Sequence, residues 1–463
     1  MGGVSVARAA AADAHRGQRI LRWVVATAGT QGVVMVLNLV TGILAARVLG
    51  PELKGIYNAV IMWPTVFYGF TSMGLAAAFT SAYARAPQEQ RRRLFVLALL
   101  LGLFWGLVGA GLCTLLAPRL LAHLGPEVRR WVLIGSWVPV PTNITNVCFS
   151  LLAVEERFTW MNWVNAGRAL TVACGLGVLA LLGQLTPYTQ LTLVWSTAFL
   201  ASLPVMVLAV RTAARFVPTR SGPGMGRVVL QLTGLGARFY SVTLASTFNA
   251  QLDQMLATIW LSATQIGLYA VASAGVSVVG AVSGAFARVF FPMAAADDAA
   301  TVTRWTVTAL RRGALLFLLV EAVLVVLARP GLHLLYGSRY LAAWPAVLTL
   351  APEAVLTACI AVLYSGCYAL RELVIPAIGE GVGAVTGAVM LVLFIPRWGI
   401  AGAGAAGSLS YALDLAAVLW LWMRRHRVPV AALWPRRADL SALVALASRY
   451  LGPWLGRGRR WVA

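Results

Sequence analysis

Apolar stretches about twenty residues long recur along nearly the whole chain, and charged residues are scarce within them. A bilayer core is about 30 Å thick, so a helix needs about 20 mostly apolar residues to cross it. Inside lipid each segment must satisfy its own backbone polar groups, which favours helices. The chain is 60% hydrophobic and 11% charged, with a mean hydropathy of +0.80. The sequence therefore predicts an all-α polytopic membrane protein.

The connections between these stretches carry residues that end helices, such as the glycines and prolines of "GPELKG", "RSGPGMG" and "IPRWG". About twelve transmembrane helices are expected between these breaks. Their predicted ranges are 22–48, 56–83, 94–117, 131–153, 161–183, 191–210, 231–261, 265–290, 309–328, 343–368, 373–395 and 399–423.

The formal net charge of +22 comes from 37 basic and 15 acidic residues. In a soluble protein such an excess would favour binding to nucleic acid. Here most basic residues lie in alternate connections between apolar stretches, as arginine and lysine do in cytoplasmic loops of membrane proteins. We expect a multi-pass membrane protein with both termini in the cytoplasm and no nucleic-acid partner.

Two segments resemble each other at a constant separation of 212 positions. The segment "LAARVLGPELKGIYNAV" begins at Leu44, and "LATIWLSATQIGLYAVA" begins at Leu256, so that Tyr57 matches Tyr269. Each ends one expected helix and begins the next. Helices 1–6 and 7–12 are therefore expected to form two six-helix lobes, related by pseudo-two-fold symmetry around a central cavity. Chance similarity between two helical hairpins is the alternative.

This repeat predicts how the chain is organised. The expected parts are a basic cytoplasmic N-terminal segment (1–21), an N-lobe (22–210), a basic linker (211–229), a C-lobe (230–423) and a basic cytoplasmic tail (424–463). Apolar and arginine positions in the tail favour an interfacial helix that binds anionic membrane lipids. A disordered tail is the alternative.

Polar side chains recur at helical spacing on the first and seventh expected helices. Gln31 and Asn38 belong to the first stripe, and Asn249 and Asp253 belong to the second. Two such stripes on equivalent helices suggest a wet cleft, in which Gln31, Asn38 and Asn249 are candidate substrate-binding residues. An ionised carboxylate that faced lipid would cost about 2.5–3.5 kcal/mol, so Asp253 should face protein or water. It is either a cavity carboxylate that binds substrate or a coupling cation, or a structural acid bonded to a neighbouring helix.

Two short motifs are better explained by packing than by chemistry. The run "GAGAAG" from Gly402 to Gly407 fits a dinucleotide-binding pattern, but no strand–turn–helix unit surrounds it. Small residues at this spacing favour close helix packing. The run "NIT" at Asn143 fits a glycosylation acceptor but lies inside an expected membrane helix. Pro139 and Pro141 are expected to kink that helix.

Several segments resemble those of a known family. "LAARVLGPELKGIYNAV" followed by "GFTSMGLAAAFTSAYAR" resembles the first hairpin of bacterial oligosaccharide flippases, the polysaccharide biosynthesis transporters of the multidrug/oligosaccharidyl-lipid/polysaccharide exporter superfamily. "QLDQMLATIWLSATQIGLYAVASA" is similar to their seventh and eighth helices, and "IPRWGIAGAGAAGSLSY" resembles a later segment. The resemblance covers residues 22 to 423.

The resemblance implies a two-lobe exporter that works by alternating access rather than an enzyme. Its substrate would be an oligosaccharide linked to undecaprenyl diphosphate, moved from the cytoplasmic to the outer leaflet for cell-surface or exopolysaccharide synthesis. The protein would lie in the bacterial cytoplasmic (inner) membrane, and a gradient of H⁺ or Na⁺ would drive the cycle with no other cofactor. The spacing of cysteine and histidine residues also predicts no metal site. A polysaccharide polymerase and assembly proteins are the partners that this function implies.

Arginine suits the diphosphate of such a substrate, because its planar fork binds two oxygens at once. Arg168, Arg238 and Arg288 lie within expected spans, and Arg238 is the first choice because it lies near the cytoplasmic side, where substrate would load. Arg168 and Arg288 would alternatively reach lipid headgroups. Arg47, in the repeated motif, would hold an outer gate or cap a turn.

Other functions stay open at this point. An ion-coupled multidrug or cation antiporter of the same superfamily would need acids in both lobes, and the first lobe has none deep within a span. A flippase for a lipid-linked peptidoglycan precursor usually has extra helices. A membrane glycosyltransferase or polymerase would need a larger polar domain. A non-transporting scaffold would leave the polar stripes unexplained.

Overall fold

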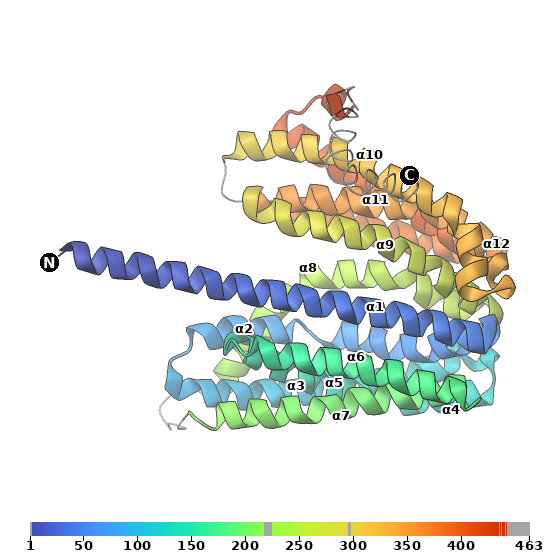
Figure 1. Ribbon diagram of the computed structural model, residues 1–463, viewed down its shortest axis with the longest axis horizontal. Helices are drawn as coiled ribbons and strands as arrows, with labels where there is room; N and C mark the ends of the chain where they lie inside the picture. Colours follow the sequence, from blue (N-terminus) through green and yellow to red (C-terminus); the bar gives the residue numbers. More distant parts are fainter. Residues whose placement is uncertain are drawn as a thin grey trace, which may run out of the picture. The chain divides into compact units, whose positions relative to one another are not determined.

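The computed structural model describes the backbone of residues 2–216, 225–294, 298–434, 436, 438–439 and 441, with most side chains from Ala26 onward. Contacts divide the chain into two units, Met1–Leu244 and Ala245–Ala463. Helices make up most of both units (Figure 1). The expected lobe ranges 22–210 and 230–423 stay a prediction.

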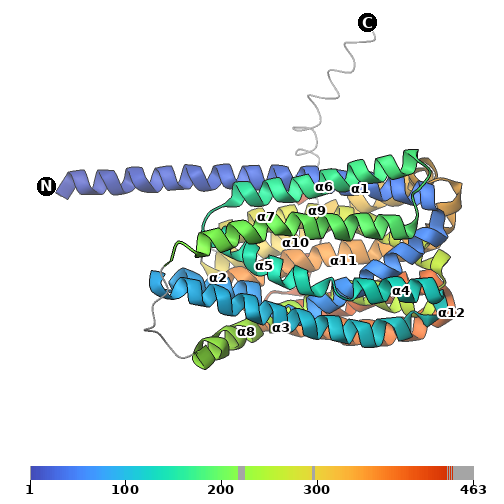
Figure 2. The same cartoon turned by 90° about the horizontal axis from the view of Figure 1, so that it is seen from below.

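The helices of unit 1 follow the expected order along the chain. They are α1 (Gly2–Thr71), α2 (Leu75–Arg85), α3 (Gln88–Leu120), η1 (Ala122–Leu124), α4 (Pro126–Gly135), α5 (Pro139–Val154), α6 (Phe158–Leu181), α7 (Pro187–Ala213) and the start of α8 (Met225–Trp260). In Figure 2, α1, α6 and α7 run side by side, and α1 packs along α6 as α3 packs along α5.

Unit 2 holds the remainder of α8 and the helices that follow it. They are α9 (Ala263–Ala294), α10 (Ala299–Gly331), η2 (Leu332–Tyr336), η3 (Ser338–Ala343), α11 (Trp344–Ala369), α12 (Val374–His426) and η4 (Val430–Leu433). Helix α11 packs against α9, α10 and α12.

Two pairs of expected helices are joined into long kinked helices. In α1 the kink falls at Gly50, with φ 72°, and in α12 it falls at Gly399, with φ 57°. Glycine tolerates this left-handed backbone because it has no Cβ. Eight helical stretches in the described part are long and apolar enough to cross a membrane. The two kinked stretches, Gly29–Thr71 and Val374–His426, each begin in one expected helix and continue through the kink into the next.

The two motifs attributed to packing behave as predicted. A Cβ added at Gly402, Gly404 or Gly407 would lie within 3 Å of another atom, and at Gly407 that atom belongs to Glu353 of α11. Asn143 is buried, and its Nδ2 donates a hydrogen bond to the Pro139 carbonyl at 3.1 Å. The prolines break the expected helix into α4 and α5 rather than only kinking it, because Pro139 begins α5.

Candidate functional site

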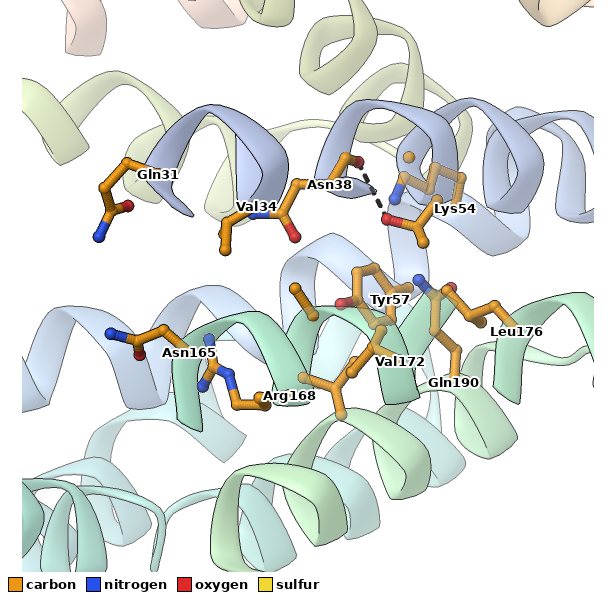
Figure 3. A pocket seen from close by; sticks show the side chains of 14 residues that line it. Gln31, Val34, Asn38, Lys54, Tyr57, Asn165, Arg168, Val172, Leu176 and Gln190 are labelled. Carbon is orange, nitrogen blue, oxygen red and sulfur yellow. Dashed lines mark hydrogen bonds between the residues drawn. The ribbon is translucent and has the colours of Figure 1, made fainter. Parts of the chain in front are cut away.

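A polar cavity of about 410 Å³ opens among α1, α6 and α7 in unit 1 (Figure 3). Eight of its lining residues carry polar or charged side chains. They are Gln31, Asn38, Thr41, Lys54, Tyr57, Asn165, Arg168 and Gln190. The apolar lining comes mainly from Val34, Val172, Leu176 and Val194. Such a mixture of surfaces suits a ligand that is both polar and bulky.

Helical periodicity places two stripes of these residues on facing helices. On α1 the lining residues Gln31, Val34, Asn38 and Thr41 follow one another at intervals of three and four. On α6 Asn165, Arg168, Val172 and Leu176 do the same. Residues at this spacing share one face of a helix. The two stripes therefore form opposite walls of the cavity, as Figure 3 shows.

The kink at Gly50 shapes one end of this cavity. It turns the chain so that Lys54 and Tyr57, beyond the kink, line the same space as Thr41 before it. The Lys54 Nζ lies 4.7 Å from the centroid of the Tyr57 ring. Gln190 reaches this end from the first turn of α7 and is 4% exposed. We call this region, made of Lys54, Tyr57 and Gln190, the kink end.

The cavity is cationic. Lys54 and Arg168 both line it, and no carboxylate is among the described residues that do so. Arg168 also borders a second cavity of about 180 Å³, beside Asn146 of α5 and Trp195 of α7. Because Arg168 borders open space on two sides, its guanidinium has room to bind two oxygen atoms of a ligand.

In contrast to the basic side chains that line the cavity of unit 1, unit 2 carries several carboxylates within its helices. The Tyr269 hydroxyl donates a hydrogen bond to Asp253 Oδ2 at 2.7 Å. Asn249 Nδ2 donates to Glu380 Oε2 at 3.4 Å. Glu353, also in this unit, is buried. These hydrogen bonds come from neutral donors, so they do not neutralise the carboxylates.

A further acid of unit 2 is still more deeply enclosed. Asp414 is 1% exposed and accepts a hydrogen bond from the Tyr364 hydroxyl at 3.3 Å. One carboxylate oxygen of Asp414 and one of Glu353 have no hydrogen-bond partner among the described residues. Within that part of the chain, no group of three or more metal-binding side chains comes together.

The structure brings together three of the predicted site residues and separates the others. Gln31, Asn38 and Arg168 line the cavity of unit 1. Asn249 and Asp253 lie on α8 within unit 2, where they belong to the acidic group. Arg47 is exposed on α1 just before the kink and is not among the residues that line the cavity.

Two predicted residues fall outside what the structure describes. Arg238 lies on α8 and Arg288 on α9, and the side chains of both are outside the described residues. Their role as phosphate ligands stays a prediction.

Sequence reasoning missed four polar lining residues: Lys54, Tyr57, Asn165 and Gln190. Lys54 carried a signal, because it is the only lysine in the chain. Tyr57 carried another, since it recurs as Tyr269 in the internal repeat. Asn165 and Gln190 lie among other polar residues on α6 and α7, and nothing local distinguishes them from polar residues elsewhere.

Residues 43–345 match the family model described as "Polysaccharide biosynthesis protein". The chain belongs to this family. The match covers most of unit 1 and the first part of unit 2, including the whole repeated motif. No curated protein matches the chain.

Solved structures show the same fold at low sequence identity. One is described as the lipid II flippase MurJ in an inward closed conformation, with 15% identity, a TM-score of 0.66 and 93% of each chain covered. Another is an inward-facing multidrug resistance MATE family transporter of the MOP superfamily, with 14% identity and a TM-score of 0.69, covering 84% of this chain and 94% of the other.

A third similar structure is a MOP superfamily transporter from Pyrococcus furiosus, whose description reports reverse polarity of the binding pocket. It has 14% identity and a TM-score of 0.58, and the match covers 88% of this chain and 95% of that one. The chain thus shares the all-α, two-lobe fold of these solved structures.

Proposed function

We propose that this protein moves an oligosaccharide linked to undecaprenyl diphosphate from the cytoplasmic to the outer leaflet of the bacterial inner membrane, by alternating access and with both termini in the cytoplasm. The product would be passed to a polysaccharide polymerase and assembly proteins. The observation that carries this proposal is the cationic cavity of unit 1, in a chain of the polysaccharide biosynthesis family.

The chemistry of the cavity matches such a substrate. The Arg168 guanidinium offers paired donors to phosphate oxygens. Asn38, Asn165 and Gln190 supply amides that can exchange hydrogen bonds with sugar hydroxyls. Both kinds of group are needed, because a lipid-linked saccharide carries a charged diphosphate and an uncharged polar surface.

The polarity of the cavity weighs against export of organic cations. A cation in this space would meet Lys54 and Arg168 without a neutralising carboxylate among the described lining residues. The acids lie in unit 2 instead. They support a second part of the proposal, in which H⁺ or Na⁺ binds near Asp253 and drives the cycle.

A lipid-linked peptidoglycan precursor is the second candidate substrate. It also carries a diphosphate, so the cavity suits it equally well, and MurJ has the same fold. Accumulated precursors distinguish the two substrates, because loss of a peptidoglycan flippase would leave a different lipid-linked saccharide on the inner leaflet.

The proposal is tested in a strain that lacks this protein and has no redundant flippase. We expect the lipid-linked saccharide to accumulate on the inner leaflet and wild-type protein to restore its outward appearance. Arg168→Gln should reduce outward transport about 10- to 100-fold, because a hydrogen bond to a charged group contributes about 1.5–3 kcal/mol.

Arg119→Gln is the matched control at equal expression. Arg119 is an exposed arginine in the last turn of α3 and does not line the cavity. Normal outward appearance of the saccharide in the deletion strain would refute the proposed function.

A further inference from the structure

Lys54 is the single lysine among the 37 lysine and arginine residues of the chain. It lies at the kink end of the cavity, over the Tyr57 ring. None of the described salt bridges includes it. A partly buried ammonium group with an aromatic face as its neighbour is well placed to receive an anionic group of a ligand.

Gln190 completes the kink end. It is buried, and its Oε1 has no hydrogen-bond partner among the described residues. A buried amide oxygen without a partner costs free energy unless a ligand supplies a donor. Figure 3 shows Gln190 and Lys54 beside Tyr57, so that an acceptor, a cation and an aromatic ring meet at one place.

The kink end is separate from Arg168. Leu176, which lies beside Gln190 in Figure 3, follows Arg168 by eight residues on α6, a rise of about 12 Å along a helix. The Arg168 guanidinium points toward Asn165, away from Lys54 (Figure 3). Because the Arg168 guanidinium extends away from Lys54, we assign the diphosphate to Arg168, which leaves Lys54 available for a second anionic group.

We propose that the kink end binds an acidic sugar of the transported glycan, with Lys54 on its carboxylate, Gln190 Oε1 on a neighbouring hydroxyl and Tyr57 against the sugar ring. This inference rests on the proposed function, because it assumes a substrate whose diphosphate occupies Arg168. The compact ammonium group has three donors and suits a single carboxylate among hydroxyls. The substrate class is therefore a lipid-linked saccharide that contains a uronic acid.

The single lysine makes a direct test available. The full chain, labelled with [¹³Cε]lysine and reconstituted in lipid nanodiscs, gives one lysine side-chain signal in an NMR spectrum. The probes are digalacturonate, its neutral counterpart digalactose, and inorganic diphosphate. We expect digalacturonate to shift the signal in a saturable way, while digalactose and diphosphate leave it in place.

Gln190→Ala should keep the lysine signal and weaken digalacturonate binding about twofold to tenfold, as expected for one lost hydrogen bond. Gln184→Ala is the matched control, because Gln184 lies just before α7 and outside the cavity lining. Unchanged binding in Gln190→Ala would remove that residue from the site and overturn the proposed arrangement.

Two results with the wild-type protein would overturn the proposal. A shift caused by diphosphate alone would place the lipid diphosphate at Lys54, which contradicts the acidic-sugar site but agrees with a flippase. No shift with any probe would show that the kink end binds none of these groups. Failure of the proposed function itself would appear separately, as normal saccharide export in the deletion strain.

Discussion

Asp253 and Tyr269 form a hydrogen-bonded pair at the positions that Thr41 and Tyr57 occupy in the other half of the repeat. The separation is 212 residues for both members. In unit 1 the corresponding pair lines the cationic cavity, whereas in unit 2 it supplies a carboxylate and its donor. Equivalent positions of the repeat thus carry two uncharged cavity-lining side chains in unit 1, but a carboxylate and its hydrogen-bond donor in unit 2.

Of two substitutions at this pair, one should reduce transport and the other should reduce stability. Asp253→Asn keeps an oxygen that accepts from Tyr269, so thermal stability should stay near normal while transport falls about tenfold or more, through loss of a charged partner. Tyr269→Phe leaves a partly buried carboxylate without its donor and should destabilise the protein by about 1–3 kcal/mol. Thermal unfolding in detergent and precursor transport measure the two effects. If Asp253→Asn instead disappears from the membrane, the acid is structural.

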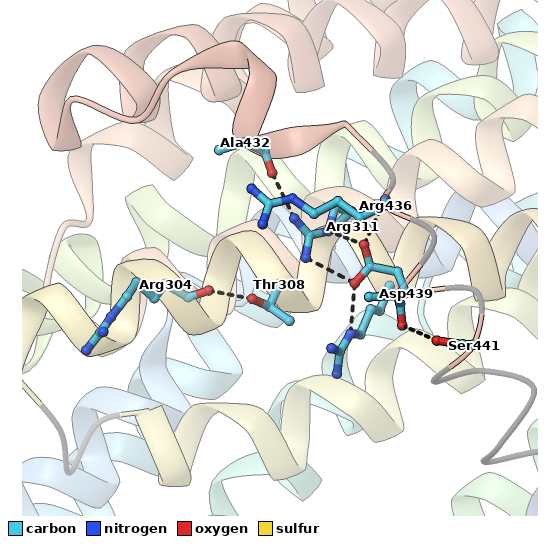
Figure 4. Close-up of polar contacts among 9 residues, drawn as sticks. Arg304, Thr308, Arg311, Ala432, Arg436, Asp439 and Ser441 are labelled. Carbon is cyan, nitrogen blue, oxygen red and sulfur yellow. Dashed lines mark hydrogen bonds and ion pairs between the residues drawn. The ribbon is translucent and has the colours of Figure 1, made fainter.

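At the scale of elements, the chain after α12 is held against α10 by ion pairs (Figure 4). The Asp439 side chain is fully buried and accepts hydrogen bonds from Arg311 Nη2 and Arg312 Nε, each at 3.0 Å. Arg311 also donates to the Ala432 carbonyl at 3.2 Å. We call this arrangement the tail clasp; it fixes the segment that precedes the rest of the basic tail.

The pKa of Asp439 sets the pH range of the tail clasp. Burial by itself would raise that pKa, but hydrogen bonds from the Arg436 amide, Arg312 and Arg311 outweigh it and hold the pKa below its ordinary value. A carboxyl whose folded pKa is lowered stabilises the folded state above its ordinary pKa of about 3.9 and loses this effect as pH falls through the folded value. The clasp should therefore stay closed from pH 7 to pH 5.

Hydrogen exchange of residues 430–439 tests this expectation. After correction for intrinsic rates, exchange in the wild type should be equal at pH 7 and pH 5, whereas Asp439→Asn should exchange faster at pH 7. Ser441→Ala is the control, since Ser441 bonds only locally to the Ala438 carbonyl among the described contacts. Equal exchange in wild type and Asp439→Asn would mean that the ion pairs do not hold the segment.

The elements also show what the sequence could predict. Helices occupy all twelve expected ranges, because a helix in lipid needs a continuous apolar run. Two of these ranges are broken in the structure, however: 56–83 between Thr71 and Leu75, and 131–153 between Gly135 and Pro139. Their joins were harder to predict. Gly50 and Gly399 were expected to end helices, but each kinks a helix that continues on its far side. Which of the two occurs depends on packing of the flanking segments, and that information is not local to the glycine.

At the scale of the whole molecule, the two units differ in charge at equivalent places. Arg168 and Glu380 are also separated by 212 residues, on α6 and on the first half of α12. Arg168 borders the cavity of unit 1, and Glu380 accepts from Asn249 in unit 2. The polar stripes that carry Gln31 and Asp253 were predictable from helical spacing. The cationic character of the unit 1 cavity was not, because Lys54 and Arg168 are 114 residues apart.

This opposite polarity predicts a division of labour between the units. In proteoliposomes with an imposed H⁺ or Na⁺ gradient, Arg168→Gln should raise KM for the lipid-linked saccharide about 10- to 100-fold, because a charge-assisted contact is lost, and leave the dependence on the ion unchanged. Glu380→Gln should weaken the dependence on the ion and leave KM near normal.

Glu127→Gln is the control for the second substitution, because Glu127 is an exposed acid in the first turn of α4. If both substitutions alter KM alone, the acids of unit 2 take part in substrate binding. If Arg168→Gln alters the ion dependence alone, the cationic cavity is not the substrate site, and the assignment of roles to the two units fails.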